Sequence, residues 1–314
     1  MKRVAFMFPG QGSQKVGMAQ EFYESFPAVK QQFEEADRLL GKNLTEIMLE
    51  GPKELLTATE NAQPALLLSS IVINHLLSAE QIKPVMAIGH SLGEYSALVA
   101  AGALSLDQAL PLVATRGKLM EDAFPEGQGT MAAVLGMSEA DIDKALAEVK
   151  DEIVDKANIN CPGQIVISGS KKGMEQASAI LKEHGAKRVL PLNVSGPFHS
   201  RLMEPANTAF AAYLKEAGIQ DATIPVYANV SANPVTKRED IEELLVKQLY
   251  SPVQFEASIR HMMDQDVDAF VEIGNGKVLS GLVKKIDRNV KSFAVQDIAS
   301  MNEFISWYKE GDVT

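Results

Sequence analysis

The sequence predicts an α/β protein in which a large domain with a mainly parallel sheet carries a smaller inserted domain. Short apolar runs alternate with helical patterns along most of the 314 residues, which favours parallel strands joined by helices. The order of elements changes between residues 129 and 195, where two strand patterns follow each other directly. The chain is also longer than most single domains, which fits an insertion.

The composition narrows the class of protein. The hydrophobic fraction of 46% and the charged fraction of 23% are typical of globular proteins and exclude collagen-like and coiled-coil chains. The formal net charge of -11 disfavours nucleic acid and an anionic membrane as partners, because both would be repelled over most of the surface. The single cysteine, Cys161, excludes an internal disulfide and a zinc site built from thiolates.

The first residues do not fit a secretory signal. Val4 to Phe8 is a short apolar run before Pro9 and Gly10, whereas the apolar part of a signal peptide is longer. We find no other apolar run that we judge long enough to span a bilayer. We therefore expect a protein that stays in the cytoplasm.

A short buried strand over residues 3–8 is predicted first, and it ends at the turn Pro9-Gly10-Gln11-Gly12. A stretch rich in Glu, Gln and Phe then predicts a helix up to about Leu40. Another helix is predicted to open at Gln63-Pro64 and to continue to residue 77, because proline favours the first position of a helix.

A second strand is predicted over residues 85–88, and it leads into the turn Gly89-His90-Ser91-Leu92-Gly93. Small helix-forming residues follow from 94 to 101. The next helix is predicted to begin at Ser105, which forms a capping-box pattern with Gln108. Arg116 lies on the flank of its apolar stripe.

The inserted domain shows a regular order of elements. Strands are predicted over residues 130–135, 153–160, 164–168 and 188–194, with helices over 138–150 and 172–184. This βαββαβ order is the ferredoxin-like motif. We expect residues 127–195 to form this small domain, and residues 1–126 and 196–314 to form the large α/β domain.

The large domain is predicted to resume with a helix over residues 198–215. Further strands are predicted at 226–230 and 269–273, and the second ends at Gly274-Asn275-Gly276. In a mainly parallel sheet of this kind, ligands bind at the carboxyl ends of the strands.

Gly89-x-Ser91-x-Gly93 fits the nucleophile elbow of hydrolase-like α/β domains, a strained turn that exposes a serine hydroxyl. The bare pattern arises easily by chance. Its position between an apolar strand and a helix is what supports a catalytic Ser91, because the fold requires that context. A tight structural turn is the alternative.

A serine nucleophile needs a base, and His199 is the best placed of the five histidines. It ends the turn-forming loop Ser195-Gly196-Pro197-Phe198-His199, directly after a predicted strand. A satisfied loop histidine is the alternative. The other histidines lie in helical patterns, at a helix end or beside the serine: His75, His90, His184 and His261.

The turn after the first strand has two possible uses. As a phosphate loop it fails, because Gly17 is followed by Met18 where a lysine is required. As part of an oxyanion hole it works, since the backbone N–H of Gln11 can pair with that of Leu92 on a developing negative charge.

Arg116 has two interpretations. An arginine on a helix is most often solvated. Beside an apolar stripe, however, a guanidinium needs a partner, and its rigid fork binds a carboxylate through two hydrogen bonds. A dicarboxylic acyl group would supply that carboxylate.

The chain resembles the malonyl-CoA:acyl carrier protein transacylase family, the malonyltransferases of bacterial fatty acid synthesis. The resemblance runs from Phe8 to Val278 and rests on these blocks: Gly10-Gln11-Gly12-Ser13-Gln14, Gly89-His90-Ser91-Leu92-Gly93-Glu94-Tyr95, Arg116-Gly117, Asn160-x-Pro162-Gly163-Gln164 and Gly196-Pro197-Phe198-His199. One departure is Asn275, where the family has proline at the centre of the turn.

The resemblance implies a role for each matching residue. Ser91 would be acylated, His199 would activate it, and Arg116 would hold the malonyl carboxylate. Gln11 and Leu92 would form the oxyanion hole, and the backbone carbonyl of Gln248 would orient the histidine, so that no triad aspartate is required. Gln63 and Asn160 would line the pocket.

The implied substrates are malonyl-CoA and the phosphopantetheine thiol of acyl carrier protein, with no cofactor and no metal. Because acyl carrier proteins are acidic, we expect a local basic surface, with candidates Lys187, Arg188, Arg201, Lys277, Lys284 and Lys285. Two rivals remain open: a serine thioesterase or other hydrolase on acyl-CoA, and a scaffold that binds acyl-CoA or a carrier protein without catalysis.

Overall fold

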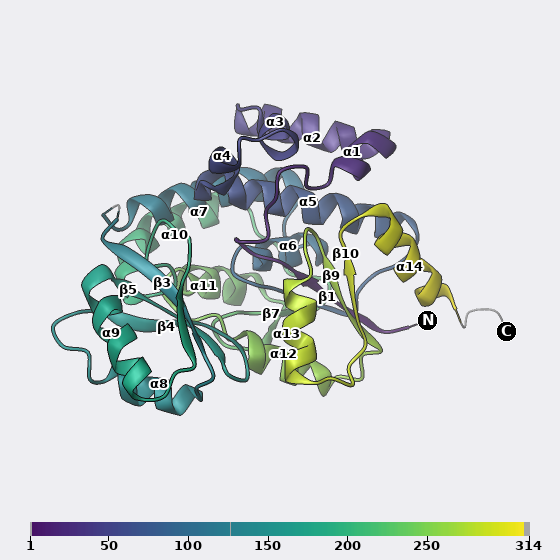
Figure 1. Ribbon diagram of the computed structural model, residues 1–314. Helices are drawn as coiled ribbons and strands as arrows, with labels where there is room; N and C mark the ends of the chain where they lie inside the picture. The colour runs from purple at the N-terminus through teal and green to yellow at the C-terminus, as the bar shows by residue number, and fades with distance from the viewer. Residues whose placement is uncertain (1, 126, 311–314) are drawn as a thin grey trace.

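The computed structural model describes residues 2–125 and 127–310 and contains two sheets of different kinds (Figure 1). The larger has the order β10-β9-β1-β2-β7-β8 and is parallel except for the β7–β8 pair, and the smaller has the antiparallel order β4-β5-β3-β6. The predicted α/β class, with a mainly parallel sheet beside a smaller one, is confirmed. Positions 1, 126 and 314, where predicted domain ranges begin or end, lie outside the described residues.

The strands of the large sheet are short and mostly buried. They are β1 (Val4–Phe8), β2 (Met86–Gly89), β7 (Val226–Tyr227), β8 (Pro234–Val235), β9 (Ala269–Ile273) and β10 (Ser292–Val295). The small sheet contains β3 (Gly129–Leu135), β4 (Val154–Cys161), β5 (Gln164–Ser170) and β6 (Arg188–Pro191). In β1, β2 and β9 every residue is buried, as expected for parallel strands covered on both faces.

The helices account for most of the remaining chain. Those before the small sheet are α1 (Gln20–Ser25), α2 (Pro27–Leu40), α3 (Leu44–Leu49), α4 (Lys53–Thr57), α5 (Thr59–Ala79), α6 (Gly93–Ala100) and α7 (Leu106–Asp122). Between the strands of the small sheet, the chain forms α8 (Glu139–Leu146) and α9 (Lys171–Glu183). The rest are η1 (Arg201–Ala206), α10 (Asn207–Glu216), α11 (Arg238–Gln248), α12 (Phe255–Met263), α13 (Val278–Ile286) and α14 (Ile298–Lys309).

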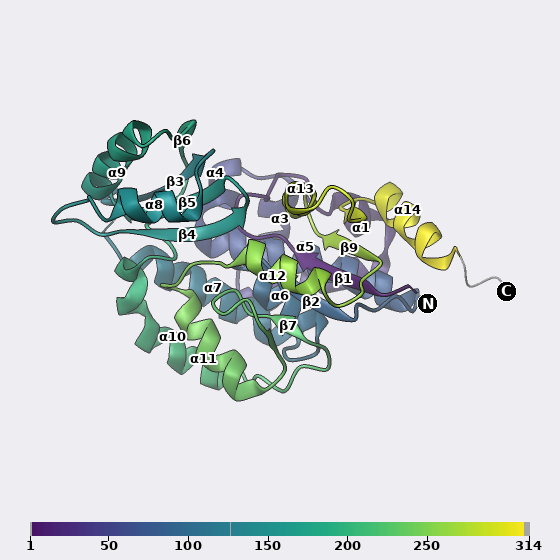
Figure 2. The ribbon, with the colours of Figure 1, turned by 90° about the horizontal axis from the view of Figure 1, so that it is seen from below.

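Helices cover both faces of the large sheet. Side chains alternate along β1, so that Phe6 and Phe8 join the core beneath α5 and α6, while Ala5 and Met7 join a second core with α12 and α13. Figure 2 shows α12 and α13 on one side of β1 and β2, and α10 and α11 beside α7.

The strands of the small sheet likewise contribute side chains to two hydrophobic cores. Ala132 and Val134 of β3 pack against α8 and α9 in a core of their own, whereas Met131 packs into the core of the large domain. β4 is joined to the large domain through the backbone, because Ile159 donates to the carbonyl of Val253. This bond fixes the backbone of β4 next to the segment that leads into α12.

Helix α5 begins earlier than predicted. It starts at Thr59, so that Pro64 lies inside the helix and not at its first position. A proline leaves the carbonyl four residues before it without its usual donor. Here that carbonyl belongs to Glu60, and it accepts a hydrogen bond from Lys42 Nζ at 3.2 Å. A contact from a distant segment therefore compensates for the proline.

Helix α5 is also long enough and apolar enough to cross a membrane, by length and composition alone. However, 78% of its apolar stretch is buried inside the molecule. The expectation that no apolar run is long enough was therefore wrong for this segment. Its hydrophobicity is that of a core helix, because α5 packs against α6 and α7. The capping box predicted at Ser105, at the start of α7, is confirmed.

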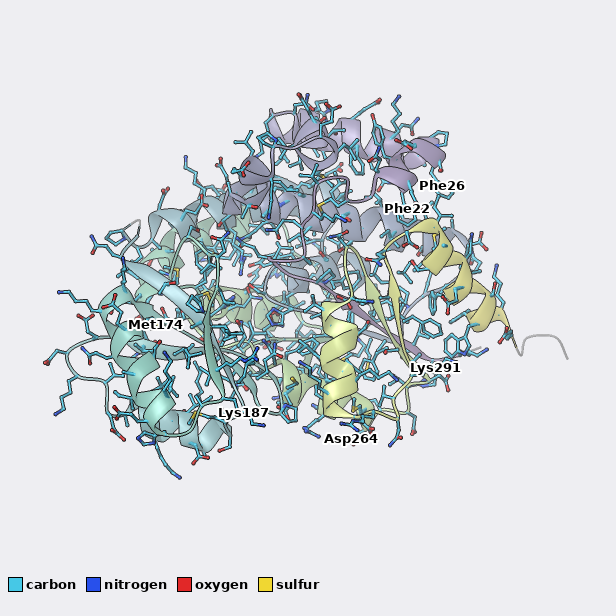
Figure 3. The ribbon with its side chains drawn as sticks, viewed as in Figure 1. Phe22, Phe26, Met174, Lys187, Asp264 and Lys291 are labelled. Atoms are coloured by element: carbon cyan, nitrogen blue, oxygen red, sulfur yellow. The ribbon has the colours of Figure 1, made fainter. Side chains whose placement is uncertain are left out.

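Several other predicted elements differ in their extent; the strand expected over residues 226–230, for example, covers only Val226–Tyr227. The predicted helix before Leu40 is broken at Phe26, whose backbone is extended before Pro27 opens α2; Phe22 and Phe26, labelled in Figure 3, stack with ring centroids 6.4 Å apart. The helix predicted from residue 198 begins only at Arg201, as η1, because His199 has a positive φ of 58°.

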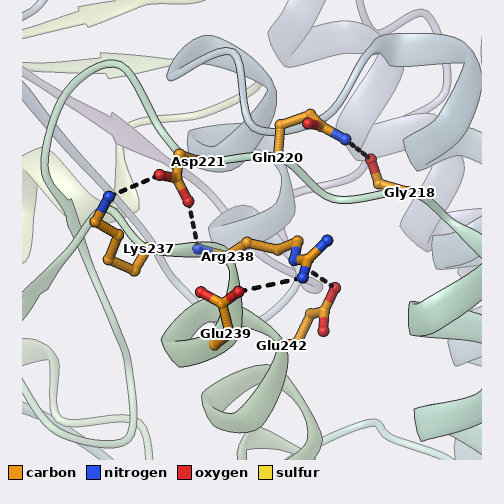
Figure 4. Close-up of polar contacts among 7 residues, drawn as sticks. All are labelled: Gly218, Gln220, Asp221, Lys237, Arg238, Glu239 and Glu242. Atoms are coloured by element: carbon orange, nitrogen blue, oxygen red, sulfur yellow. Dashed lines mark hydrogen bonds and ion pairs between the residues drawn. The ribbon is translucent and has the colours of Figure 1, made fainter.

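Helix α11 is anchored at its start by charged contacts that Figure 4 shows. Asp221 accepts from the backbone N–H of Arg238 at 2.9 Å and pairs with Lys237 Nζ at 2.9 Å. Arg238 also contacts Glu239 and Glu242 of the same helix. A carboxylate at a helix N-terminus is favourable. The anchored helix ends at Gln248.

Glycines allow the turns after β1 and β2 to touch. A Cβ atom at Gly93 would lie 2.0 Å from the carbonyl oxygen of Phe8, and one at Gly10 would lie 2.3 Å from that of His90. No side chain fits at such distances. The contact brings the backbone of residues 10–12 next to the turn that carries Ser91.

We predict that Gly93→Ala separates these turns. The added methyl group forces β1 or α6 to shift, and we expect a loss of about 3 kcal/mol in the free energy of unfolding, together with loss of acylation at Ser91. Urea unfolding followed by circular dichroism measures the first effect.

The matched control is Gly281→Ala in α13, where nothing lies within 4 Å of the new Cβ atom. This variant should gain about 0.5–1 kcal/mol, because alanine favours a helix over glycine. Equal stability of the two variants would show that the contact between the turns is not required.

Candidate active site

Ser91 lies at the tight turn between β2 and α6. Its φ of 53° is in the left-handed region, which is uncommon for a residue other than glycine, and this matches the predicted elbow. Asn229 holds the turn, because its Oδ1 accepts from Ser91 N at 2.8 Å and its Nδ2 donates to the carbonyl of Gly89 at 2.7 Å. No local sequence pattern identifies Asn229, which comes from a loop after β7.

His199 is the partner of the serine. Its Nε2 lies 2.7 Å from Ser91 Oγ, and its Nδ1 lies 2.8 Å from the backbone carbonyl of Gln248. A carbonyl can only accept, so Nδ1 must carry the hydrogen and Nε2 is free to accept from the serine hydroxyl. The carbonyl of Gln248 therefore fixes the tautomer and the orientation of this imidazole.

The imidazole is held in its neutral form. Burial, and then the positive charge of Arg116, lower the pKa of His199 to about 3. Since protonation is disfavoured in the folded protein, His199 stays unprotonated near neutral pH. A neutral imidazole against a serine hydroxyl is a competent general base.

Arg116 completes the group at Ser91. Its side chain is 1% exposed, so the interpretation as a solvated helix residue is wrong. Its NH2 atom lies 3.2 Å from Ser91 Oγ and 2.8 Å from Gln248 Oε1, and NH1 lies 2.8 Å from Gln63 Oε1. The guanidinium carbon lies 5.3 Å from the centre of the Tyr95 ring. The predicted meeting of positions 91, 116 and 199 is therefore found.

Two backbone donors beside Ser91 have no partner. Within residues 2–125 and 127–310, neither Gln11 N nor Leu92 N donates a hydrogen bond to another protein group, while Ser91 N and Gly93 N both do. Leu92 is 1% exposed. Unpaired buried N–H groups are uncommon and need an explanation. Their position after β1 and after the serine is that expected of an oxyanion hole.

A cavity of about 310 Å³ opens onto the dyad. Its walls come from segments around both sheets and combine amide, sulfur and aromatic groups: Gln11, Gly12, Gln14, His90, Ser91, Met120, Met131, Asn158, Leu192, Asn193, Val194, Phe198 and His199. The serine hydroxyl is therefore reached through a cleft between the two sheets.

Two residues predicted to line the pocket lie outside this lining. Gln63 is buried and binds Arg116, as described above. Asn160 Oδ1 lies 2.8 Å from His90 Nε2, and the residue of β4 that lines the cavity is Asn158. β4 is irregular between Ile159 and Cys161, so simple alternation does not place these side chains.

Glu94 lies behind the dyad and was also missed. Its Oε2 accepts from Gln248 Nε2 at 2.7 Å and from the backbone N–H of Asn229 at 3.1 Å. Burial raises the pKa of Glu94 to about 7, and the contacts to Asn229 and Gln248 oppose that rise. No local pattern marks Glu94 as a site residue, because its partners are distant in sequence.

A half-buried serine at a strand-to-helix turn, a buried histidine against it and unpaired N–H groups beside them define the class of enzymes that move acyl groups through serine. Comparison with known proteins agrees, since the sequence model of the acyl transferase domain matches residues 5–309. The chain belongs to the malonyl CoA-acyl carrier protein transacylase family, as its similarity to curated relatives shows. The resemblance drawn from the sequence motifs is confirmed.

The relatives match over nearly their whole length. The chain is 51% identical to the malonyl CoA-acyl carrier protein transacylase of Bacillus subtilis, over 99% of this chain and 98% of that protein. It is 46% identical to the protein of the same name from Staphylococcus aureus, over 96% of this chain and 99% of that protein.

Solved structures agree. An acyl carrier protein S-malonyltransferase from Vibrio cholerae superposes with a TM-score of 0.94 at 43% identity, covering 96% of this chain and 100% of that chain. A malonyl-transacylase solved in complex with a type II polyketide synthase acyl carrier protein superposes with a TM-score of 0.95 at 42% identity. The superposition covers 97% of this chain and 99% of that chain.

We predict that Ser91 stays reactive in mildly acidic solution. Because the pKa of His199 is lowered to about 3, the neutral base persists as the pH falls below 6.5. The rate of inactivation by an uncharged sulfonyl fluoride should therefore stay level between about pH 5 and pH 8. Arg116→Ala should move the acid inflection upward, because the arginine charge contributes to the shift.

The control is the same reagent on Ser91→Ala, which should not react. An inflection near pH 6.5 in the wild type would contradict the burial and charge effects assigned to His199.

Proposed function

We propose that the chain moves a malonyl group from malonyl-CoA to the phosphopantetheine thiol of acyl carrier protein, through a malonyl ester on Ser91, in fatty acid biosynthesis. One observation carries the proposal: Ser91 Oγ lies 2.7 Å from the base and 3.2 Å from a buried guanidinium. The first contact serves acyl transfer, and the second selects an acyl group that has a carboxylate.

The first half-reaction forms the ester. His199 Nε2 takes the hydroxyl proton as Ser91 Oγ attacks the thioester carbonyl. The oxygen that becomes negative is stabilised by the N–H groups of Gln11 and Leu92, each typically worth about 3 kcal/mol of barrier. As the carbon–sulfur bond breaks, His199 returns the proton to the sulfur, and coenzyme A leaves.

The second half-reaction reverses these steps. The phosphopantetheine thiol gives its proton to His199 and attacks the malonyl ester, and the proton then returns to Ser91. Donor and product are both thioesters, so the transfer needs no ATP, metal or cofactor, and coenzyme A takes part only as the carrier of the substrate. The same dyad serves both halves, which gives ping-pong kinetics.

Selection depends on Arg116. We propose that it pairs with the malonyl carboxylate through its fork, while Gln63 and Gln248 hold it in place. An acetyl group would leave this buried cation without its partner, and such a loss produces strong rejection. Asn160 acts less directly, by holding His90 at the cavity wall.

The finer features of the fold are also proposals. The order β3, α8, β4, β5, α9, β6 supports a ferredoxin-like small domain over residues 127–195. The elbow after β2 supports a hydrolase-like large domain over residues 1–126 and 196–314. The buried position of α5 supports a cytoplasmic protein.

The hydrolase alternative is less well supported. Hydrolases with this elbow place an acid between the serine and the histidine in chain order. Here the histidine Nδ1 contacts the carbonyl of Gln248, and the relatives carry the names of transacylases.

We predict a covalent adduct that depends on two residues. After mixing with malonyl-CoA, intact-protein mass spectrometry should show one malonyl group on the wild type and none on Ser91→Ala. Arg116→Ala should lose malonyl transfer and gain acetyl transfer, because the buried charge that rejects an apolar acyl group is gone.

Malonyl-CoA without any thiol acceptor is the control. Rapid consumption under that condition would identify a thioesterase, and a wild type without adduct would identify a binding protein.

We propose that the acidic carrier protein docks on a basic surface beside β6. We define the basic rim as Lys187, Arg188 and Lys285. The Lys187 side chain lies over Gly136, which donates to the carbonyl of Gly163 in the turn after β4. Lys285 donates to Gln164 at 2.9 Å, so both lysines flank this turn. Figure 3 labels Lys187 in the small domain. β6 runs from this rim to the cavity wall at residues 192–194.

The other candidate cations are less suitable. Arg201 is paired with Asp155 at 2.9 Å, and Lys284 donates to the backbone carbonyls of Arg288 and Val290. Lys277 is exposed at the start of α13 and extends the basic region toward Asn275.

We predict that Lys187→Glu/Lys285→Glu raises KM for acyl carrier protein about tenfold at low salt and weakens its salt dependence, because complementary charge controls encounter. Malonyl loading of Ser91 should not change. Lys30→Glu/Lys215→Glu, on α2 and α10, is the matched control, and equal effects of the two pairs would refute the basic rim.

A further inference from the structure

Glu94 is a buried carboxyl group beside the site, and the mechanism above gives it no role. It lies in the first turn of α6 and is 3% exposed. Its hydrogen bonds go to Asn229, which holds the serine turn, and to Gln248, which holds the histidine. Both partners belong to segments far from Glu94 in sequence, so it connects the parts of the site.

The Glu94 carboxylate, together with the carbonyl of Ser91, which accepts from the same Nε2 at 3.1 Å, fixes how the Gln248 side chain is oriented. A carboxamide has a donor end and an acceptor end, and either could face a given neighbour. An ionised Glu94 can only accept, so it draws Nε2 of Gln248, while Arg116 can only donate and faces Oε1. Gln248 is 0% exposed, so water does not compete for either end.

Glu94 also offsets the buried charge without occupying the guanidinium. An isolated buried cation is costly, and Glu94 is among the groups whose charge acts on Arg116. A direct ion pair would fill the fork that a substrate carboxylate needs. With one carboxamide between the two charges, Arg116 is stabilised while no carboxylate occupies its fork.

We infer that Glu94 is a positioning residue for recognition of the acyl carboxylate: it fixes the Gln248 carboxamide, which in turn holds Arg116 against Ser91. The inference rests on the proposed malonyl transfer. It assigns Glu94 to selection between acyl groups, and it leaves proton transfer to His199.

The test compares malonyl-CoA with acetyl-CoA as donors for Glu94→Gln, a change that keeps the shape and removes the charge. We expect KM for malonyl-CoA to rise about tenfold, the size expected for a weakened hydrogen bond to a charged group. The kcat/KM for acetyl-CoA should stay within about twofold of the wild type. The preference for malonyl over acetyl therefore falls.

The matched control is Glu272→Gln. Glu272 is also a buried carboxyl group of the large domain, but it accepts from the backbone of Leu279 and Ser280 at the start of α13. This variant should lose stability without changing the malonyl preference. The same change in preference in both variants would overturn the inference, because it would reflect a general loss of structure.

A double-mutant cycle locates the effect. In an Arg116→Ala background, Glu94→Gln should no longer alter the ratio of malonyl to acetyl transfer, since the group it positions is absent. If Glu94→Gln lowered transfer of both acyl groups equally, or left the ratio as in the wild type, the inference would be wrong.

Gln248→Leu tests the same connection if Glu94→Gln does not fold. It removes the carboxamide and keeps the backbone carbonyl that binds His199, so the malonyl preference should again fall. An unchanged preference would refute the inference. Failure of the proposed function is separable, because the wild type would then take no malonyl group at Ser91.

Discussion

The guanidinium of Arg116 is held almost entirely out of water, with 1% exposure, and the rest of the site is arranged around that charge. Burying a cation costs several kcal/mol unless hydrogen bonds and opposite charge offset it. Gln63 and Gln248 supply the oxygen acceptors, and the Tyr95 ring lies beneath. Among the described residues, no carboxylate forms an ion pair with it. The cation is therefore stabilised and still able to bind one.

The sequence predicted well those parts of the site whose partners are adjacent in the chain. The elbow at Ser91 depends on glycines two residues away, and the cap at Ser105 on a glutamine three residues away. The order of strands and helices around the small sheet also followed from local patterns. The loop position of His199 could be read from the sequence, but its distance to Ser91 could not, because 108 positions separate the two residues.

The parts that local patterns missed depend on long-range contacts. Asn229 and Glu94 act through residues more than a hundred positions apart, so no spacing rule identifies them. Pro64 was placed at a helix start because the hydrogen bond from Lys42 to Glu60 is not visible in the sequence. The late start of the helix at Arg201 was not visible either, since the pattern from residue 198 resembles one continuous helix.

The same buried charge also couples recognition to catalysis. In the free protein, burial and the Arg116 charge lower the pKa of His199. A carboxylate paired with Arg116 would offset the second of these effects, and the imidazole would become a stronger base when an acyl group with a carboxylate is bound. An acetyl group would leave the base weakened. Under the proposed mechanism, one guanidinium therefore favours malonyl twice, through binding and through the basicity of the group that activates Ser91.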